Sequence, residues 1–199
     1  MHPETLRELP PGKYCFTCLS PEIEKQRLKT KEVYLCKVCK RRDGKIIQID
    51  PTIKTVWRNG VMQHYTVGAL LFNQRKNKFL LMKKRTYPVV IDVIAGHINV
   101  HEAPAQALAR EVAEETGYQI HKRKKVWQGL IKNDYCRRGA PNHYWYLYLC
   151  TFKGGQKADK EEVAYLRYYT AEQLKHEKKI NPAVKKMIAG LDLSVRKSP

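Results

Sequence analysis

Apolar runs separated by short polar stretches occupy the second two thirds of the chain and predict an α/β domain. Residues 66–72 and 79–82 are apolar runs on either side of the polar, turn-like stretch 73–77, which is the pattern of two adjacent strands. A third apolar run at 89–94 predicts another strand, which ends just before Gly96. The order of these runs favours a sheet that is covered by helices.

A helix is predicted over residues 103–116, which are rich in Ala, Leu, Glu and Gln. Pro104 falls where a first helical turn tolerates proline, and Gly117 falls where a residue just past a helix end is expected. Apolar residues recur at helical spacing and would bury one face of this helix: Ala105, Leu108, Ala109 and Val112.

The remaining pattern predicts further strands and a helical tail. Residues 125–132 and 143–152 are expected to be strands around a loop at 137–142, and another strand is expected to end at Tyr169. Helical stretches follow up to about residue 191, interrupted at Asn181-Pro182. Thr170 and Gln173 have the spacing of a capping box at the start of this tail.

The 199 residues are enough for one ordinary domain and a small module in front of it. We expect a loose lead at 1–12, a cysteine-bearing module at 13–45, a connector at 46–61 and the α/β domain at 62–199. Within the connector, residues 46–49 have the pattern of a short strand that Asp50-Pro51 interrupts.

Four cysteines near the start form two C-x-x-C pairs that are separated by 17 residues: Cys15, Cys18, Cys36 and Cys39. This is the spacing of a four-cysteine structural zinc site, and a segment this short and basic cannot bury a core of its own. Bound zinc would supply on the order of 10 kcal/mol. The sequence therefore predicts a small zinc ribbon. The alternative is two chance pairs of buried or redox-active cysteines, and Cys136 and Cys150 are expected to be isolated thiols.

Three glutamates of the predicted helix, Glu111, Glu114 and Glu115, are spaced so that they lie on one face. Their mutual repulsion would destabilise a purely structural helix, whereas Mg²⁺ or Mn²⁺ would favour such a group of carboxylates. Gly96 allows a tight turn whose carbonyl can face the metal, and Arg110 can orient a neighbouring acid. The alternative is a solvated acidic helix face.

The whole string from Gly96 to Tyr118 resembles the signature of the Nudix family, Gly-x5-Glu-x7-Arg-Glu-U-x-Glu-Glu-x-Gly-U, where U is aliphatic. Every fixed position matches: Gly96, Glu102, Arg110, Glu111, Glu114, Glu115 and Gly117. The last position holds Tyr118, where an aliphatic residue is usual. The resemblance covers roughly residues 62–190 and implies an α/β/α sandwich with a mixed sheet.

The resemblance also implies an activity, the hydrolysis of a nucleoside diphosphate linked to another moiety, as in dinucleotides, nucleotide sugars and dinucleoside polyphosphates. By the same resemblance, the metal ligands are Glu111, Glu114 and Glu115, assisted by the Gly96 carbonyl, and Glu102 and Arg110 support them. A general base is also needed. It is either a helix glutamate or a later acid, for which Glu161 and Glu162 are the candidates, with a solvated acidic pair as the alternative.

Aromatic residues and histidines offer candidate contacts to substrate. Tyr135 lies roughly where dinucleoside polyphosphate hydrolases of this family have a tyrosine. Tyr144 and Tyr146 share one face of a predicted strand, and they either stack on a base or belong to the core, which we favour. For His97 and His101, a solvated loop is favoured over contact with phosphate.

A zinc ribbon in front of a Nudix signature resembles the NADH pyrophosphatase branch of the family. The Ser-Gln-Pro-Trp element that this branch carries after its signature does not occur here.

The chain carries 38 Lys and Arg against 19 Asp and Glu, a net charge of +19, which favours polyanionic partners. The charge is scattered rather than gathered in one stripe, which weakens a case for sequence-specific nucleic-acid binding. We therefore expect a nucleotide-type small molecule, with RNA binding or RNA-cap processing as the alternative, and a homodimer is compatible with either. No apolar run predicts a membrane span and no secretory signal is evident, so a cytoplasmic location is expected.

Overall fold

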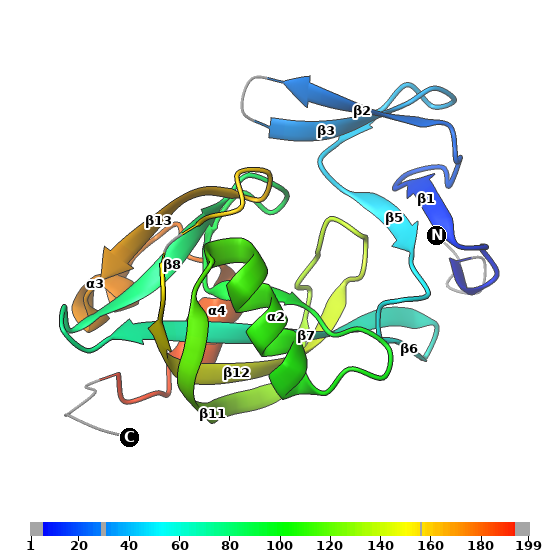
Figure 1. The fold of residues 1–199 in the computed structure, drawn as a ribbon. Helices are drawn as coiled ribbons and strands as arrows, with labels where there is room; N and C mark the ends of the chain where they lie inside the picture. The colour runs from blue at the N-terminus through cyan, green and yellow to red at the C-terminus, as the bar shows by residue number, and fades with distance from the viewer. Residues whose placement is uncertain (1–5, 29–30, 156, 194–199) are drawn as a thin grey trace.

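The computed structural model of the chain describes residues 6–28, 31–155 and 157–193. It shows a large mixed sheet with helices on both faces and, beside it, a group of short strands formed by the first fifty residues (Figure 1). Within the described residues, no helix combines the length and the apolar character that crossing a membrane requires. The lead that we expected at 1–12 falls partly outside the described residues.

The large sheet has the strand order β11-β12-β7-β8-β13. These strands are β7 (Val61–Asn73), β8 (Lys78–Lys84), β11 (Gln119–Lys132), β12 (Asn142–Lys153) and β13 (Val163–Tyr169). β12 pairs with β7 in parallel, and the other neighbours are antiparallel. Three short strands extend the sheet: β6 (Thr55–Arg58) and β10 (Ile94–His97) pair with β7, and β9 (Ile91–Asp92) pairs with β8. The mixed sheet that we predicted is confirmed.

Helices cover both faces of this sheet because the side chains of β7 alternate between two cores. Val67, Ala69 and Leu71 pack on the side of α2 (Pro104–Thr116). Leu70 and Phe72 pack on the opposite side, with residues of α3 (Ala171–His176) and α4 (Pro182–Ile188). Since a strand directs successive side chains to opposite faces, the continuous apolar run of β7 can serve both cores. The predicted α/β/α sandwich is therefore confirmed.

The helix boundaries follow the local signals in the sequence. α2 begins at Pro104 and ends at Thr116, and it is followed by Gly117, whose φ of 73° is the left-handed conformation that glycine adopts readily. Thr170 caps α3 with the reciprocal hydrogen bonds of a capping box that includes Gln173. The predicted interruption of the tail is also confirmed, because Asn181 caps α4 through a hydrogen bond from the Ala183 N–H.

The apolar run at 89–94 does not form the single strand that we predicted. It divides into β9 and β10, which pair with different neighbours. The division falls where the buried Asp92 side chain accepts a hydrogen bond from the Val93 backbone N–H at 2.9 Å, which occupies a donor that a continuous strand would use for its ladder. A polar residue inside the apolar run was the signal for this break.

The N-terminal strands form two small sheets. β1 (Gly12–Cys15) pairs with β5 (Ile46–Ile49), while β2 (Ile23–Leu28), β3 (Lys31–Cys36) and β4 (Arg42–Asp43) form an antiparallel sheet. The turns after β1 and β3 bring four cysteines together, with Sγ–Sγ distances of 3.6 Å for Cys15–Cys39 and 3.6 Å for Cys18–Cys36. The cluster is consistent with the predicted zinc-binding ribbon. Of the expected connector, β5 pairs with the ribbon and β6 pairs with the large sheet.

Candidate functional site

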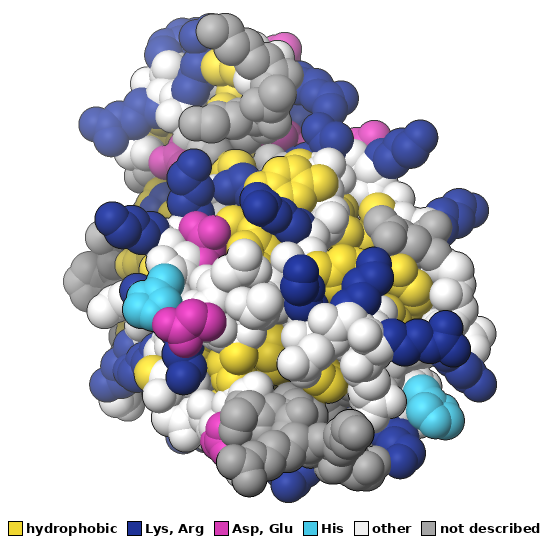
Figure 2. Space-filling view, turned by 90° about the vertical axis from the view of Figure 1, so that its left-hand side faces the viewer, with side chains coloured by type: hydrophobic (Ala, Val, Ile, Leu, Met, Phe, Trp, Pro, Cys, Tyr) yellow, Lys and Arg dark blue, Asp and Glu magenta, His cyan; other side chains and the backbone are white. Residues whose placement is uncertain are grey.

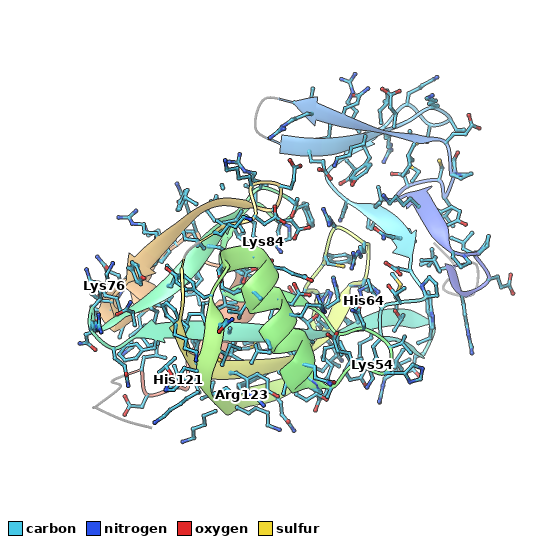
Figure 3. All side chains as sticks on the ribbon, in the orientation of Figure 1. Lys54, His64, Lys76, Lys84, His121 and Arg123 are labelled. Atoms are coloured by element: carbon cyan, nitrogen blue, oxygen red, sulfur yellow. The ribbon has the colours of Figure 1, made fainter. Side chains whose placement is uncertain are left out.

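One cleft collects most of the polar residues that the sequence singled out. Its volume of about 310 Å³ lies at the lower end of the range for small-molecule sites. It is lined by α2, β10, the loop between β11 and β12, and the segment before β13. In Figure 3, His64 is labelled beside the β11–β12 loop and Lys84 is labelled near the end of α2. The charged residues that line the cleft are Asp50, Lys84, Asp92, Arg110, Glu111, Glu114, Glu115, Asp134, Arg137, Arg138, Asp159 and Glu162.

Gly96 lies against the carboxylate of Glu111. A Cβ atom at position 96 would overlap this carboxylate, so only glycine fits here while Glu111 keeps its place. Position 96 belongs to β10, which pairs with β7 through Gly96 and Val67. The contact therefore ties the backbone of the sheet to the acidic face of α2.

Arg110 connects the acids that precede and follow it. Its Nε and Nη2 atoms donate to the two carboxylate oxygens of Glu102 at 2.9 and 3.0 Å, a bidentate arrangement. Its Nη1 donates to Glu111 at 2.7 Å and to Glu114 at 3.2 Å. A further bond from Nη2 to the His97 carbonyl, at 3.0 Å, fixes the guanidinium to β10. One cation thus holds three carboxylates in fixed positions beside the cleft.

The three helix glutamates differ in how deeply their side chains are buried. Glu115 is only 4% exposed and accepts a hydrogen bond from the Ala95 N–H at 3.1 Å. Burial, together with the charge of Glu111, raises the pKa of Glu115 well above its usual value, although Lys84 acts in the opposite direction. Burial also raises the pKa of Glu111, which Arg110 partly offsets. The Glu114 side chain is 58% exposed.

This combination fits a hard divalent cation. Partly buried carboxylates that repel one another gain from a nearby positive charge, and oxygen ligands suit Mg²⁺ and Mn²⁺. The missing side chain at Gly96 leaves its backbone free to approach the same place.

Of the two acids proposed as general base, Glu162 lines the cleft and Glu161 does not belong to the lining residues. Glu162 accepts a hydrogen bond from Arg137 Nη2 at 2.9 Å. Its charge contributes to raising the pKa values of both Glu111 and Glu115. Glu162 therefore acts electrostatically on the same carboxylates, whereas the Glu161 backbone N–H donates a hydrogen bond to the Asp159 carboxylate at 2.7 Å.

Of the three tyrosines proposed to contact substrate, only one lines the cleft. Tyr135 lines the cleft and is 38% exposed, with Lys45 Nζ lying 4.6 Å from its ring centroid. Tyr144 and Tyr146 do not belong to the lining residues. Their ring centroids lie 5.3 Å apart, and Tyr65 packs against Tyr144 at 5.5 Å. Tyr146 is half-buried and packs against the core on the α2 side, which fits the core alternative, whereas Tyr144 is half-buried without belonging to either core. A substrate contact for these two tyrosines gains no support from this placement.

The sequence pattern did not predict a second cluster of potential metal ligands in the cleft wall: His64, His97, Cys136 and His143. The expectation that Cys136 is an isolated thiol is wrong, because its Sγ lies 3.8 Å from His64 Nδ1. The expectation that His97 lies in a solvated loop is also wrong, because it belongs to β10 and packs against the rings of His64 and His143. Cys150 is a buried core residue and His101 is exposed in a loop.

The four side chains of this cluster influence one another strongly. Burial of the imidazole lowers the pKa of His97, a residue that lines the cleft, to about 3. Burial alone would lower the pKa of His143, but its interactions with Asp134 and Cys136 outweigh burial and raise the pKa to about 10. Burial alone would raise the pKa of Cys136, but hydrogen bonds with the three histidines bring it well below its usual value.

The strand register explains why these residues meet. His143 lies opposite His64 in the β12–β7 ladder, and His97 lies opposite Thr66 in the β10–β7 ladder. A signal was present, since each of these histidines stands at the end of an apolar run. The sequence gives no indication that these run ends lie on adjacent strands.

Comparisons with known proteins agree with this geometry. The family model of the NUDIX domain matches residues 62–191. No curated protein sequence matches the chain. Among solved structures, a MutT NUDIX hydrolase from Burkholderia pseudomallei superimposes with a TM-score of 0.55 at 16% identity, covering 64% of this chain and 96% of that one.

Two further structures share the fold. The MutT protein from Methanosarcina mazei Go1 has a TM-score of 0.55 at 20% identity, covering 64% of this chain and 91% of its own. The NUDIX domain of Shewanella oneidensis NrtR, solved as a complex with ADP ribose, has a TM-score of 0.53 at 15% identity, covering 64% of this chain and 86% of its own.

Proposed function

Since the chain belongs to the Nudix family, we propose that it is a metal-dependent hydrolase that cleaves the diphosphate linkage of a nucleoside diphosphate joined to another moiety. The observation that carries this proposal is the arrangement at α2. Glu111, Glu114 and Glu115 line one cleft, and the backbone of Gly96 approaches the same carboxylates. A helix that served only the fold would not gather these charges in a hollow.

Glu111, Glu114 and Glu115, with the carbonyl of Gly96, would hold Mg²⁺ or Mn²⁺. When bound, such ions neutralise phosphate charge and lower the pKa of attacking water. Arg110 and Glu102 act as positioning residues, because the guanidinium fixes both Glu111 and Glu114. The four ribbon cysteines, by the spacing of their sulfur atoms, would hold a structural Zn²⁺.

Glu162 is the better candidate for the general base. In the reaction, water oxygen bonds to one phosphorus, the bridging P–O bond breaks, and the proton of water passes to a carboxylate. Glu162 lines the cleft, and its hydrogen bond with Arg137 holds it in place there. The second phosphate then leaves with the bridging oxygen.

Cationic groups in the cleft suit a diphosphate. Arg137, Arg138 and Lys84 all line it. The Nε atom of Arg138 is buried without a hydrogen-bond partner among the described residues, so a phosphate oxygen would supply the acceptor that it lacks. Tyr135 offers a ring on the same cleft for a base or sugar.

A compact substrate is favoured over a long nucleic acid. The cleft volume of about 310 Å³ suits a nucleotide-sized ligand. Lys and Arg side chains are scattered over the face shown in Figure 2 and form no continuous stripe there. The NUDIX domain of NrtR, which shares the fold, was solved with ADP ribose, a compound of the proposed class.

A substrate screen tests this proposal. Purified protein would be incubated with Mg²⁺ or Mn²⁺ and with nucleotide sugars, dinucleotides, dinucleoside polyphosphates and capped RNA, and the products separated by chromatography. We expect cleavage of at least one compact nucleotide, and strong loss of cleavage in Glu114→Gln, whose exposed side chain can change without disturbing the core. Glu161→Gln, outside the cleft lining, serves as the control.

Two outcomes would count against it. Folded protein that cleaves no compound with either metal would refute the hydrolase assignment. Capped RNA as the best substrate would replace the small-molecule assignment and leave the metal-dependent reaction intact.

A further inference from the structure

We propose that His64, His97, Cys136 and His143 form a second zinc site, which fixes the β11–β12 loop to the sheet in the wall of the cleft. One donor atom from each of these residues lies within 4.8 Å of every other. The site is distinct from the helix glutamates and from the ribbon cysteines, and it does not depend on the activity proposed above.

The distances agree with tetrahedral zinc. Zn–N bonds of about 2.0–2.1 Å and Zn–S bonds of about 2.3 Å place a nitrogen and a sulfur ligand about 3.6 Å apart. Cys136 Sγ and His64 Nδ1 are 3.8 Å apart. The ribbon cysteines, which are spaced for the same ion, have Sγ–Sγ distances of 3.6 Å. The remaining donor pairs of the cluster, which lie within 4.8 Å, would contract to about 3.3–3.6 Å around the ion.

The donor set selects the metal. Three imidazoles and one thiolate are borderline-soft ligands, which favour zinc over the hard ions that suit carboxylates. His64 is 2% exposed and His143 is 3% exposed, so these polar rings are removed from water and require partners. One ion would bind one nitrogen of each ring.

Asp134 lies where the outer carboxylate partner of a zinc-bound histidine is expected. Its Oδ2 lies 3.3 Å from His143 Nδ1, which is within ion-pair distance, although the two atoms are not hydrogen-bonded. Because Nδ1 faces this carboxylate, Nε2 is the nitrogen of His143 that would bind the metal. The same oxygen accepts a hydrogen bond from Trp145 Nε1 at 2.7 Å. The His143 ring would then lie between the Asp134 carboxylate and the metal, and these two contacts would fix its orientation.

A thiol nucleophile is the main alternative, because Cys136, His143 and Asp134 also follow the order of a Cys-His-Asp triad. A triad, however, uses one histidine. Here the rings of His64 and His97 pack against each other and against His143, with centroids 4.8, 5.7 and 5.6 Å apart. A metal accounts for all three rings, whereas a nucleophile accounts for only one.

Four protein ligands leave no open coordination position, so the role is structural. The ligands come from β7, β10, β12 and the β11–β12 loop. That loop also accepts backbone hydrogen bonds from β5, Ile46 N to Arg137 O at 2.7 Å and Gln48 N to Arg138 O at 3.0 Å. Zinc at Cys136 would anchor the segment that carries both arginines into the cleft and joins it to the ribbon.

Metal counting on the full chain tests the proposal. The wild-type protein should contain two zinc ions per chain, one at each cluster. Cys136→Ala should retain one, and a combined Cys36→Ser and Cys136→Ala variant should retain none. Cys150→Ala, which removes a buried thiol away from the cluster, should retain two. One zinc in the wild type, unchanged by Cys136→Ala, would overturn the site.

X-ray absorption at the zinc edge needs no variant and so covers the case in which Cys136→Ala fails to fold. Two filled sites, one with four sulfurs and one with three nitrogens and one sulfur, give an average of about 2.5 sulfur and about 1.5 nitrogen ligands per zinc. A shell of sulfur alone would overturn the proposal. Rapid alkylation of Cys136 by iodoacetamide in zinc-loaded protein would also overturn it, and would favour the nucleophile.

Discussion

The backbone of Gly96 and the carboxylate of Glu111 occupy adjoining space, so that a Cβ atom at position 96 would overlap the carboxylate. This contact joins strand β10, rather than the tight turn that the sequence suggested at Gly96, to the first of the three acids of α2. It also explains in physical terms why the signature begins with glycine.

Gly96→Ala should therefore abolish most of the activity while the protein still folds. The end of the Glu111 side chain can swing away, so the fold survives at a cost of about 1–2 kcal/mol. Its hydrogen bond with Arg110 and its position in the cleft are lost. We expect kcat to fall at least about 100-fold. Gly190→Ala, where an added Cβ meets no atom within 4 Å, is the matched control. Wild-type kcat in Gly96→Ala would show that the position of Glu111 does not matter.

Cys36→Ser should remove the ribbon zinc and loosen residues 13–45 preferentially. Because a segment this short has no core of its own, losing the ion removes most of its stability. Limited proteolysis with mass spectrometry should show new cleavages there, while the large sheet stays protected. Val38→Ser changes an exposed residue of the same turn and should leave the pattern unchanged. Four free thiols and no zinc in the ribbon of the wild type would refute the assignment.

Asp92→Asn should change how stability depends on pH. Burial raises the pKa of Asp92 to about 6, partly offset by Lys84 and by the hydrogen bond from Asn181. The native state therefore binds more protons than the unfolded state between about pH 4 and 6, and stability falls as the pH rises through this window. The full effect is about 3 kcal/mol.

The variant lacks this ionisation, so its stability should fall less than that of the wild type over the same window. Its absolute stability includes a separate cost, because an amide at position 92 cannot accept from both present donors as well as a carboxylate does. Urea unfolding of the metal-free protein at several pH values measures the difference. Parallel curves for the two proteins would contradict a raised pKa at Asp92.

Salt should affect a compact substrate only modestly. A nucleotide held in the cleft contacts few phosphate-binding groups, so kcat/KM should fall less than about tenfold between about 50 and 200 mM salt. A long RNA that contacts many of the scattered lysines would lose affinity by orders of magnitude over the same range. If kcat/KM for capped RNA exceeded that of the best nucleotide at every salt concentration, the compact-substrate proposal would fail.

The parts of the site that lie close together in sequence were predictable. Helical spacing put Glu111, Glu114 and Glu115 on one face, and the two C-x-x-C pairs indicated a four-cysteine cluster, because both patterns depend on local geometry. The cluster around Cys136 depends instead on the parallel register of β7 with β12, which places His143 beside His64. Residues so distant in sequence meet only through tertiary pairing, which the sequence pattern does not specify.

The same reason explains the other differences. Arg138 reaches the cleft because its loop is hydrogen-bonded to β5, a strand that pairs with β1 of the ribbon. The division of the run at 89–94 depends on Asp92, whose buried partner Asn181 comes from the distant start of α4. In both cases the structure depends on a contact between residues that are distant in sequence.

Turnover by Glu115→Gln in Mg²⁺ tests the central claim most directly. Glutamine keeps the shape of the side chain and an oxygen that can accept the Ala95 N–H, but it removes the charge from a buried position. With the best nucleotide substrate, we expect kcat to fall at least about 100-fold. The stability of the metal-free protein should stay level or rise, because a buried, repelled carboxylate is gone. Glu161→Gln should retain wild-type kcat. An unchanged kcat for Glu115→Gln in Mg²⁺ would contradict the account.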